Sequence, residues 1–98
     1  MEIVRATPKH VTELTILFEH YRAFYKAEQD YQAAYSFIEE RLKEEDSVIF
    51  IALDFNNRGM GFVQLYPAFS SVAMKKLWLL NDLYVDEKYR KLGLARKL

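Results

Sequence analysis

Apolar residues recur every three to four positions over two stretches of the chain, which is the spacing of one face of an α-helix. The first stretch follows Thr7 and Pro8, a pair suited to a helix start because Thr can cap the first turn and Pro fits its first position. The second stretch follows a break at Gln29-Asp30 and ends in the charged run RLKEED. We therefore expect two amphipathic helices, the first of roughly five turns. Their apolar stripes comprise Val11, Leu14, Phe18, Tyr21 and Tyr25, then Tyr31, Tyr35, Ile38 and Leu42.

Apolar and β-branched runs predict strands before and after these helices. EIVR opens the chain, and SVIFIAL (47–53) is apolar on both faces, as a buried strand would be. The turn DFNNRG joins it to the strand MGFVQLYP (60–67), AFSSVAMK (68–75) is expected to be a loop, and KLWLLNDLYV (76–85) is a further strand. A final helix is expected to begin near Lys91. The order is β-α-α-β-β-β-α, of the α/β (α+β) class, in a single domain over residues 1–98.

The charges balance, with 14 basic and 14 acidic residues and a formal net charge of +0. A chain without a basic excess is poorly suited to electrostatic capture of nucleic acid or anionic membrane. It has no cysteine, which excludes disulfides and Cys-ligated zinc, and His10 and His20 lack a matching ligand, so we expect no metal. The longest apolar run, Val48–Leu53, is too short to cross a bilayer, and no signal peptide is visible, so we expect a cytoplasmic protein.

The turn after the last predicted strand carries the residues best suited to bind an anion. Arg90, Gly93 and Ala95 stand at the mouth of the expected helix, whose free N–H groups and partial positive charge favour phosphate. Gly93 lets the backbone approach an anion closely, and Lys91 and Arg96 add positive charge. The pattern lacks the Gly-Lys-Ser/Thr of a Walker A loop and the repeated glycines of a dinucleotide fingerprint. One glycine beside basic residues also describes an ordinary helix start, so both interpretations stand on this pattern alone.

The run Arg90-Lys91-Leu92-Gly93-Leu94-Ala95 resembles the Arg/Gln-x-x-Gly-x-Gly/Ala motif of the GNAT acetyltransferase superfamily. The segments IVRATPKHVTEL, GFVQLYP and LNDLYVDEKYR resemble that family's opening strand and helix, its third strand and its fourth strand. The resemblance implies a mixed, mostly antiparallel sheet with two helices packed on it, and acetyl-CoA as the acetyl donor. It also implies a bulge that splays the fourth strand from the next and makes room for the donor.

The resemblance further implies where the donor binds. The pyrophosphate would lie against backbone amides of the turn, and the pantetheine arm would pair with the backbone of the fourth strand. A backbone N–H there would polarise the thioester carbonyl. The implied donor-binding residues are Leu83, Tyr84 and Val85 on the strand, and Arg90, Lys91, Leu92, Gly93, Leu94, Ala95 and Arg96 in the turn.

Asp82 is the candidate general base, because family members often use a carboxylate on this strand to take the proton of the amine. The alternative for Asp82 is a structural role, bonding loop or turn backbone near the strand end. Asn81 stands at a neighbouring position where some relatives carry Glu, and the usual general acid, a Tyr, would lie beyond Leu98. Tyr25 and Tyr31 fall where the first two helices wall the acceptor site in the family, and core packing is the alternative for both.

The last helix has no C-terminal signal before Leu98. We therefore interpret the 98 residues as the donor-binding N-terminal part of an N-acetyltransferase, truncated after the start of the coenzyme A-binding helix and able to transfer little acetyl alone. The acceptor would be an amine on a small molecule or peptide. The alternative is a non-catalytic CoA-binding or protein-interaction module with the same fold. An uncovered fourth strand would favour self-association, so a homodimer or another self-associated species is expected.

Overall fold

The computed structural model describes residues 1–98, except for the side chains of Lys91, Leu92 and Leu94. Short 3₁₀ helices at Pro8–His10 and Glu87–Leu92 precede the first and last α-helices. The predicted α+β class and the order of strands and helices are confirmed. The elements are β1 (Glu2–Arg5), α1 (Val11–Phe24), α2 (Tyr31–Glu44), β2 (Val48–Leu53), β3 (Gly59–Ser70), β4 (Lys75–Val85) and α3 (Leu94–Lys97).

The ends of the two long helices satisfy backbone groups that would otherwise lack partners. Ahead of α1, the backbone N of Thr7 donates to Nδ1 of His10 at 3.0 Å. At the start of α2, the backbone N of Ala33 donates to Oδ1 of Asp30 at 3.1 Å. α2 ends at Glu44, and the next residue, Glu45, caps it in a left-handed conformation with φ 52°. Both helices therefore begin and end close to the residues at which the sequence pattern changes.

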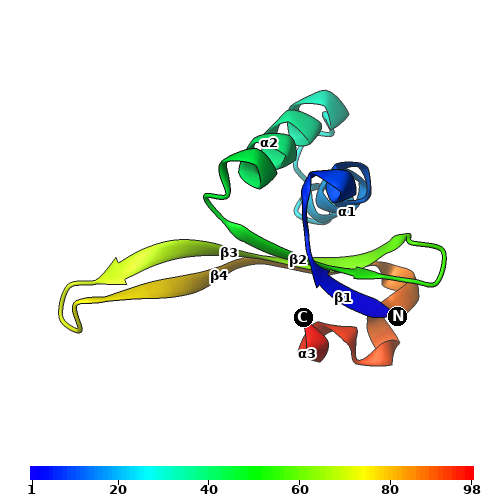
Figure 1. Cartoon of the computed structure of the whole chain (residues 1–98). Coiled ribbons are helices and arrows are strands. Elements are labelled where there is room, and N and C mark those ends of the chain that lie inside the picture. Colours follow the sequence, from blue (N-terminus) through cyan, green and yellow to red (C-terminus); the bar gives the residue numbers. More distant parts are fainter.

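The strands form one four-stranded sheet in the order β1-β2-β3-β4. Its three pairings are all antiparallel, in agreement with the mostly antiparallel sheet that the family resemblance implied. Figure 1 shows α1 and α2 on one face of this sheet, and the turn into α3 on the other face. β4 is the last strand in the order, so one of its sides is an open edge.

The main core lies between the sheet and the helices α1 and α2. Ile51 of β2 is 0% exposed and Phe62 of β3 is 1% exposed, so both are sealed under the helices. Burial of one such side chain stabilises the fold by roughly 1.5–3 kcal/mol. The buried members of this core are Ala6, Leu14, Leu17, Ile38, Leu42, Ile49, Ile51, Leu53 and Phe62. A smaller cluster consists of Ala52, Met60 and Val85, with Ile3, Tyr89 and Leu98 packed against it.

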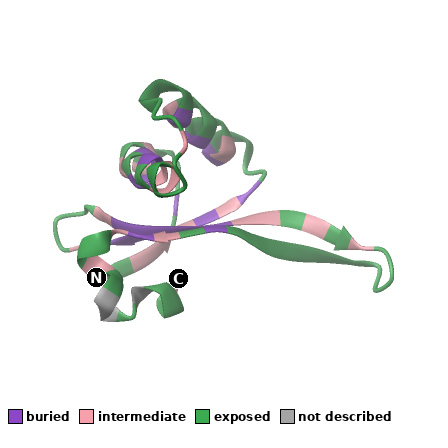
Figure 2. Ribbon diagram, turned by 180° about the vertical axis from the view of Figure 1, so that it is seen from behind, coloured by how far each residue is buried: buried purple, intermediate pink, exposed green. Residues whose placement is uncertain are grey.

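The predicted loop over residues 68–75 is wrong. Strand pairing continues as far as Ser70 opposite Lys75, and only a short turn separates the two strands. β2 pairs with β3 no further than Leu65, so no strand lies beside Pro67 on that side of β3. Proline has no backbone N–H, and here its absence leaves no hydrogen bond of the sheet unmade. Because proline is tolerated there, the strands run on as a long arm. Figure 2 shows this β3–β4 arm projecting beyond the helices, largely exposed along β4.

The predicted helix start near Lys91 is also wrong. The 3₁₀ helix begins one turn earlier, where Oδ1 of Asp86 accepts a hydrogen bond from the backbone N of Lys88 at 3.1 Å. Gly93 then adopts φ 71° and ends that helix, and α3 begins only at Leu94. A left-handed residue reverses the direction of the chain. The turn therefore contains two short helices where the sequence predicted one helix.

Candidate active site

Asp82 lies beside a bulge in the pairing of β3 with β4. Gln64 of β3 pairs with Asp82, but the next residue, Leu65, pairs with Leu80. Asn81 is therefore the additional residue of β4. A bulge bends the strand and redirects the side chains next to it. A bulge in this strand, as the family resemblance implied, is confirmed, whereas the splaying of β4 from a next strand stays a prediction.

The Asp82 carboxylate is 6% exposed and accepts a hydrogen bond on each oxygen. Nε2 of Gln64 donates to Oδ2 at 2.8 Å, and Nδ2 of Asn81 donates to Oδ1 at 3.1 Å. A carboxylate offers about four lone-pair positions, so these two bonds leave it able to accept another proton. Both donors are side chains of the sheet, whereas the structural alternative expected loop or turn backbone.

Two tyrosine hydroxyls are coupled electrostatically to Asp82. Burial, followed by hydrogen bonding to Asp82 and by its negative charge, raises the pKa of Tyr21 to about 12. Burial and the same charge raise the pKa of Tyr66. Both hydroxyls therefore keep their protons at neutral pH. The Tyr21 ring, on α1, lies 6.2 Å from the ring of Tyr84 on β4, centre to centre, which brings α1 to this part of the sheet.

The implied pantetheine-binding residues lie on the open edge of the sheet. The backbone N of Asp86 donates to the carbonyl oxygen of Met60 on β3 at 2.8 Å. Backbone groups of successive residues point to alternate sides of a strand. Tyr84 therefore directs its backbone groups toward β3, while Leu83 and Val85 direct theirs toward the open edge. Two of the three implied strand residues are thus placed to pair with an extended ligand.

Arg90 turns back onto this same edge. Its Nε donates to the carbonyl oxygen of Val85 at 2.8 Å. Its guanidinium carbon lies 5.5 Å from the centre of the Phe24 ring and 5.4 Å from that of Tyr84, within cation–π range of both. These contacts hold the turn after β4 against the end of α1. They border an open groove of about 750 Å³ lined by His20, Ala23, Phe24, Tyr84, Asp86, Glu87, Lys88 and Arg90.

The glycine of the implied phosphate turn faces open space. A Cβ atom built on Gly93 would meet no described heavy atom within 4 Å. Ala95 and Arg96 are exposed in α3. The space around Gly93 is compatible with close approach of a ligand to its backbone. The side chains of the remaining implied turn residues, Lys91, Leu92 and Leu94, lie outside those that the structure describes.

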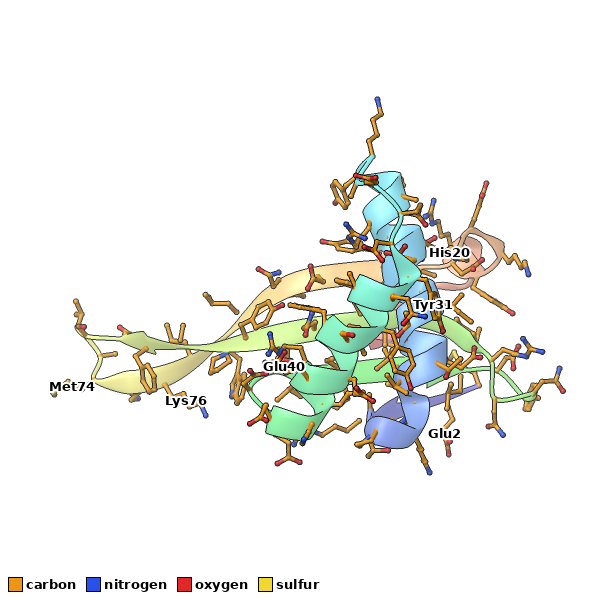
Figure 3. All side chains as sticks on the ribbon, turned by 90° about the horizontal axis from the view of Figure 1, so that it is seen from above. Glu2, His20, Tyr31, Glu40, Met74 and Lys76 are labelled. Atoms are coloured by element: carbon orange, nitrogen blue, oxygen red, sulfur yellow. The ribbon has the colours of Figure 1, made fainter. Side chains whose placement is uncertain are left out.

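The two candidate acceptor residues lie on different sides of the interhelical loop. Tyr25 follows α1, is 67% exposed, and packs edge-on against Tyr21 with ring centres 5.1 Å apart. Tyr31 begins α2, is 43% exposed, and lies near His20 in Figure 3. Tyr31 and His20 both line a hollow of about 310 Å³. Tyr25 is thus connected to Asp82 through Tyr21, whereas Tyr31 borders a separate hollow, and their exposure argues against core packing.

Other features of the described residues lie away from Asp82. No group of three His, Cys, Asp or Glu side chains in the described chain could hold a metal ion. None of the described helices is long and apolar enough to span a membrane. A hollow of about 410 Å³, lined in part by His10 and Glu13, lies beside β1. β1 is at the opposite edge of the sheet from β4, so this hollow is separate from the candidate site.

Two residues of the Asp82 environment were not identified from the sequence. Gln64 is 0% exposed and Ser47 is 5% exposed, and Oγ of Ser47 donates to Oε1 of Gln64 at 2.9 Å. Gln64 stands inside an otherwise apolar and aromatic strand, which is itself a signal of a buried polar contact. Ser47 at the start of its strand carries no such signal.

The comparisons with known proteins agree with one another, since the family and the relatives that match are described as acetyltransferases. The Acetyltransferase (GNAT) family matches residues 14–98. The chain is 42% identical over 98 residues to an uncharacterized N-acetyltransferase, YhfO, of Bacillus subtilis, covering all of this chain and 65% of that protein. It is 33% identical over 87 residues to a probable acetyltransferase of Haemophilus influenzae, covering 89% of this chain and 60% of the relative. The chain therefore spans less than two thirds of the length of these two curated relatives.

A solved structure agrees with this fold closely. The crystal structure of a probable acetyltransferase superposes with a TM-score of 0.94 at 43% identity, covering all of this chain and 66% of that one. The family match includes most of α1, and all of α2, the strands β2 to β4 and the turn with Gly93. This chain belongs to the GNAT family of acetyltransferases.

Proposed function

We propose that this protein is an N-acetyltransferase that moves an acetyl group from acetyl-CoA to an amine. One observation carries the proposal: the Asp82 carboxylate lies beside a bulge in β4, the strand whose other side is the open edge of the sheet. Family membership supports the reaction class. A thioester held along that edge would bring its acetyl carbon near the only part of β4 that has a buried carboxylate among the described residues.

The residues present fit the donor at two places. The outward backbone groups of Leu83 and Val85 suit the pantetheine arm, and the open space at Gly93 suits a pyrophosphate on the amides of 91–96. Because Arg90 already donates to the oxygen of Val85, we assign strand pairing with the pantetheine arm mainly to Leu83. When bound, acetyl-CoA supplies an acetyl group activated as a thioester.

In the proposed reaction a nitrogen–carbon bond forms and the carbon–sulfur bond breaks, while the amine nitrogen loses a proton and the sulfur gains one. We propose that Asp82 accepts the amine proton on one of its remaining lone pairs. A proton-transfer partner must come within hydrogen-bond reach of this carboxylate. The hydroxyl of Tyr21, which keeps its proton at neutral pH, helps to hold the charge that Asp82 carries. We assign no residue to protonation of the sulfur.

The acceptor is proposed to be an amine on a small molecule or a peptide, with Tyr25 and Tyr31 at the helix side of its path. Both rings are well exposed and could contact a ligand. The second candidate function is a non-catalytic module that binds CoA or a protein partner. The 6% exposure of Asp82 favours this alternative, because it restricts access to the proposed base.

We also propose that a second copy of the chain covers the β4 edge along the arm, up to Leu80, and leaves the edge at Leu83 and Val85 to the donor. An open edge strand offers unpaired backbone groups, and large exposed apolar side chains favour association. Exposed apolar residues of the arm and of β4 are Phe69 (78%), Val72 (97%), Met74 (89%), Leu77 (43%), Trp78 (47%), Leu79 (54%), Leu80 (60%) and Leu83 (39%). A cytoplasmic location, and the expectation of no metal and no nucleic-acid or membrane partner, stay predictions.

The proposed function is tested by thiol release from acetyl-CoA with a panel of small and peptide amines, using the gene product at its natural length. We expect thiol release that depends on the acceptor and falls about 100-fold or more in Asp82→Asn. Asp82→Asn keeps the size of the side chain and removes its capacity as a base. Transfer that is equally fast in Asp82→Asn would exclude the base role. Binding of acetyl-CoA without transfer to any amine would favour the non-catalytic module.

A further inference from the structure

A continuous line of buried polar side chains ends at Asp82. Ser47 at the entrance to β2, Gln64 on β3 and Asp82 on β4 are 5%, 0% and 6% exposed. Oγ of Ser47 donates to Oε1 of Gln64 at 2.9 Å, and Nε2 of Gln64 donates to Oδ2 of Asp82 at 2.8 Å. The three side chains therefore cross the sheet beneath its helices as one hydrogen-bonded row.

The two ends of the row fix the orientation of the Gln64 amide. If the amide were turned over, its oxygen would face the carboxylate oxygen of Asp82, and two acceptors would meet with no proton between them. In the observed orientation the amide oxygen receives the Ser47 hydroxyl and the amide nitrogen donates to Asp82. Gln64 therefore has one favourable arrangement, and it holds Oδ2 of Asp82 at a fixed point.

Burial of the Gln64 amide lowers the stability of the fold unless the amide makes its hydrogen bonds. A buried amide is destabilising when its hydrogen bonds are not made, and an apolar side chain of similar size would fill the same space without that risk. The neighbouring positions of β3, Phe62 and Val63, are apolar and buried. A polar residue at Gln64 thus serves the carboxylate more directly than it serves the core.

We propose that Gln64 is the positioning residue for the proton acceptor Asp82, and that Ser47 sets the orientation of Gln64. The inference rests on the proposed function. By holding Oδ2, Gln64 leaves the lone pairs of Asp82 that face away from β3 as the ones that receive the amine proton. Asn81, which donates to Oδ1 at 3.1 Å from the bulge, limits rotation of the carboxylate about the same axis.

The surroundings of Asp82 contain other groups that affect its charge. Tyr21 from α1 and Tyr66 from β3 are the titratable groups coupled to it, and Arg41 and Asp46 act on Tyr66 from the end of α2 and the segment after it. The amides of Gln64 and Asn81, both neutral, donate to its two oxygens, and the hydroxyl of Tyr21, which is neutral at pH 7, also bonds to Asp82. Replacing Gln64 by a neutral residue therefore changes the position of the carboxylate without changing the charges around it.

The first test compares turnover and donor binding in Gln64→Met, again with the gene product at its natural length. Methionine has a similar length and shape but cannot donate to Asp82. We expect kcat to fall about 10- to 100-fold, as for a misplaced catalytic group, while the Kd for acetyl-CoA and the KM for the amine stay at the parent values. Ser47→Ala should lower kcat less, because Gln64 can still donate to Asp82.

Thr15→Val is the matched control. Thr15 is 0% exposed and its hydroxyl donates to the carbonyl oxygen of Val11 at 2.7 Å, so the variant also removes a buried polar contact, away from Asp82. We expect its kcat to equal that of the parent. A loss of kcat in Thr15→Val as large as in Gln64→Met would mean that both act through stability, and would overturn the positioning role.

The outcomes separate the inference from the proposed function. If Asp82→Asn is inactive and Gln64→Met keeps the parent kcat, only the inference fails. If the parent shows no acceptor-dependent transfer, or Asp82→Asn is fully active, the proposed reaction or base fails, and the inference with it.

A second measurement needs no turnover. In a nitrogen-15 NMR spectrum, we expect the Gln64 side-chain NH₂ protons to be protected from solvent exchange and their signals to shift in Asp82→Leu. Rapid exchange of these NH₂ protons with solvent, together with signals that do not shift in Asp82→Leu, would overturn the proposal.

Discussion

Nε of Arg90 donates a 2.8 Å hydrogen bond to the carbonyl oxygen of Val85, and this bond joins the turn after β4 to the open edge of β4 itself. Two aromatic rings, those of Phe24 and Tyr84, flank the same guanidinium. The contact links α1, β4 and the turn that contains Gly93, so the geometry of the proposed donor site depends on it.

Arg90→Met should destabilise the chain by about 1 kcal/mol, because it removes this hydrogen bond and two partly exposed cation–π contacts but keeps an apolar stem. Urea unfolding measures the change. Lys88→Met is the control, since Lys88 is exposed in the same turn and should shift stability by less than about 0.5 kcal/mol. Equal effects of the two substitutions would show that the Arg90–Val85 contact contributes nothing in solution.

Gly61→Ala should separate β3 from β4. A Cβ atom at Gly61 would lie 2.7 Å from the carbonyl oxygen of Tyr84 and 3.2 Å from the Cα of Val85, and backbone atoms cannot rotate away. We expect a loss of roughly 1–3 kcal/mol in the free energy of unfolding and weaker binding of acetyl-CoA. At Gly59 the added atom meets the end of the Leu17 side chain, so Gly59→Ala should cost less. A Gly61→Ala protein as stable as the parent would contradict the close approach.

The raised pKa of Tyr21, about 12, predicts a dependence of stability on alkaline pH. The unfolded chain releases this proton near pH 10, so between about pH 10 and about pH 12 the native state binds more protons, and the free energy of unfolding falls as pH rises. Tyr21→Phe should make that fall less steep. Tyr66, Tyr84 and Tyr89 also have raised pKa values and keep their own contributions, so the difference between parent and variant is the quantity to measure. Identical slopes would contradict the raised pKa of Tyr21.

The proposed dimer predicts a light-scattering mass of about twice the monomer mass for the 98-residue chain. Leu79 and Leu80 are 54% and 60% exposed on the edge strand, and the double substitution Leu79→Lys with Leu80→Lys should give a monomer because the charges repel across the interface. Ile16→Lys is the control, since Ile16 is 37% exposed on α1, away from that edge. A monomeric parent at high concentration would refute the proposal.

Much of the fold follows from local patterns. The stripe from Val11 to Tyr25 needs only the helical period, and Asp30 marks the start of α2 because its side chain caps the first turn. The strands of β2 and β4 follow from continuous β-branched and apolar runs. The extension of β3 and β4 into an arm did not follow from the local pattern. Pro67 and the serines after it are typical of a loop when the neighbouring strands are unknown.

The details of the site depend on register, which sequence spacing does not fix. Asp82 could be selected as a carboxylate on the fourth strand, but its pairing with Gln64 depends on the bulge at Asn81. Likewise, the contact of Arg90 with Val85 arises because a 3₁₀ helix begins directly after Asp86. A residue that acts through a neighbour on another strand, such as Gln64, is therefore the kind of site residue that sequence reasoning misses.

Titration calorimetry of the chain with acetyl-CoA tests the central claim most directly, because it measures donor binding without an acceptor. We expect saturable binding to one site in the parent and at least about tenfold weaker binding in Gly93→Asn. Asparagine tolerates the left-handed conformation of Gly93, φ 71°, so this variant adds bulk at the phosphate turn with little backbone strain. The Gly93→Asn variant keeps Ala95 and Arg96, the implied turn residues in α3, unchanged. No heat of binding in the parent, or equal affinity in Gly93→Asn, would contradict the assignment of this turn and edge strand as an acetyl-CoA site.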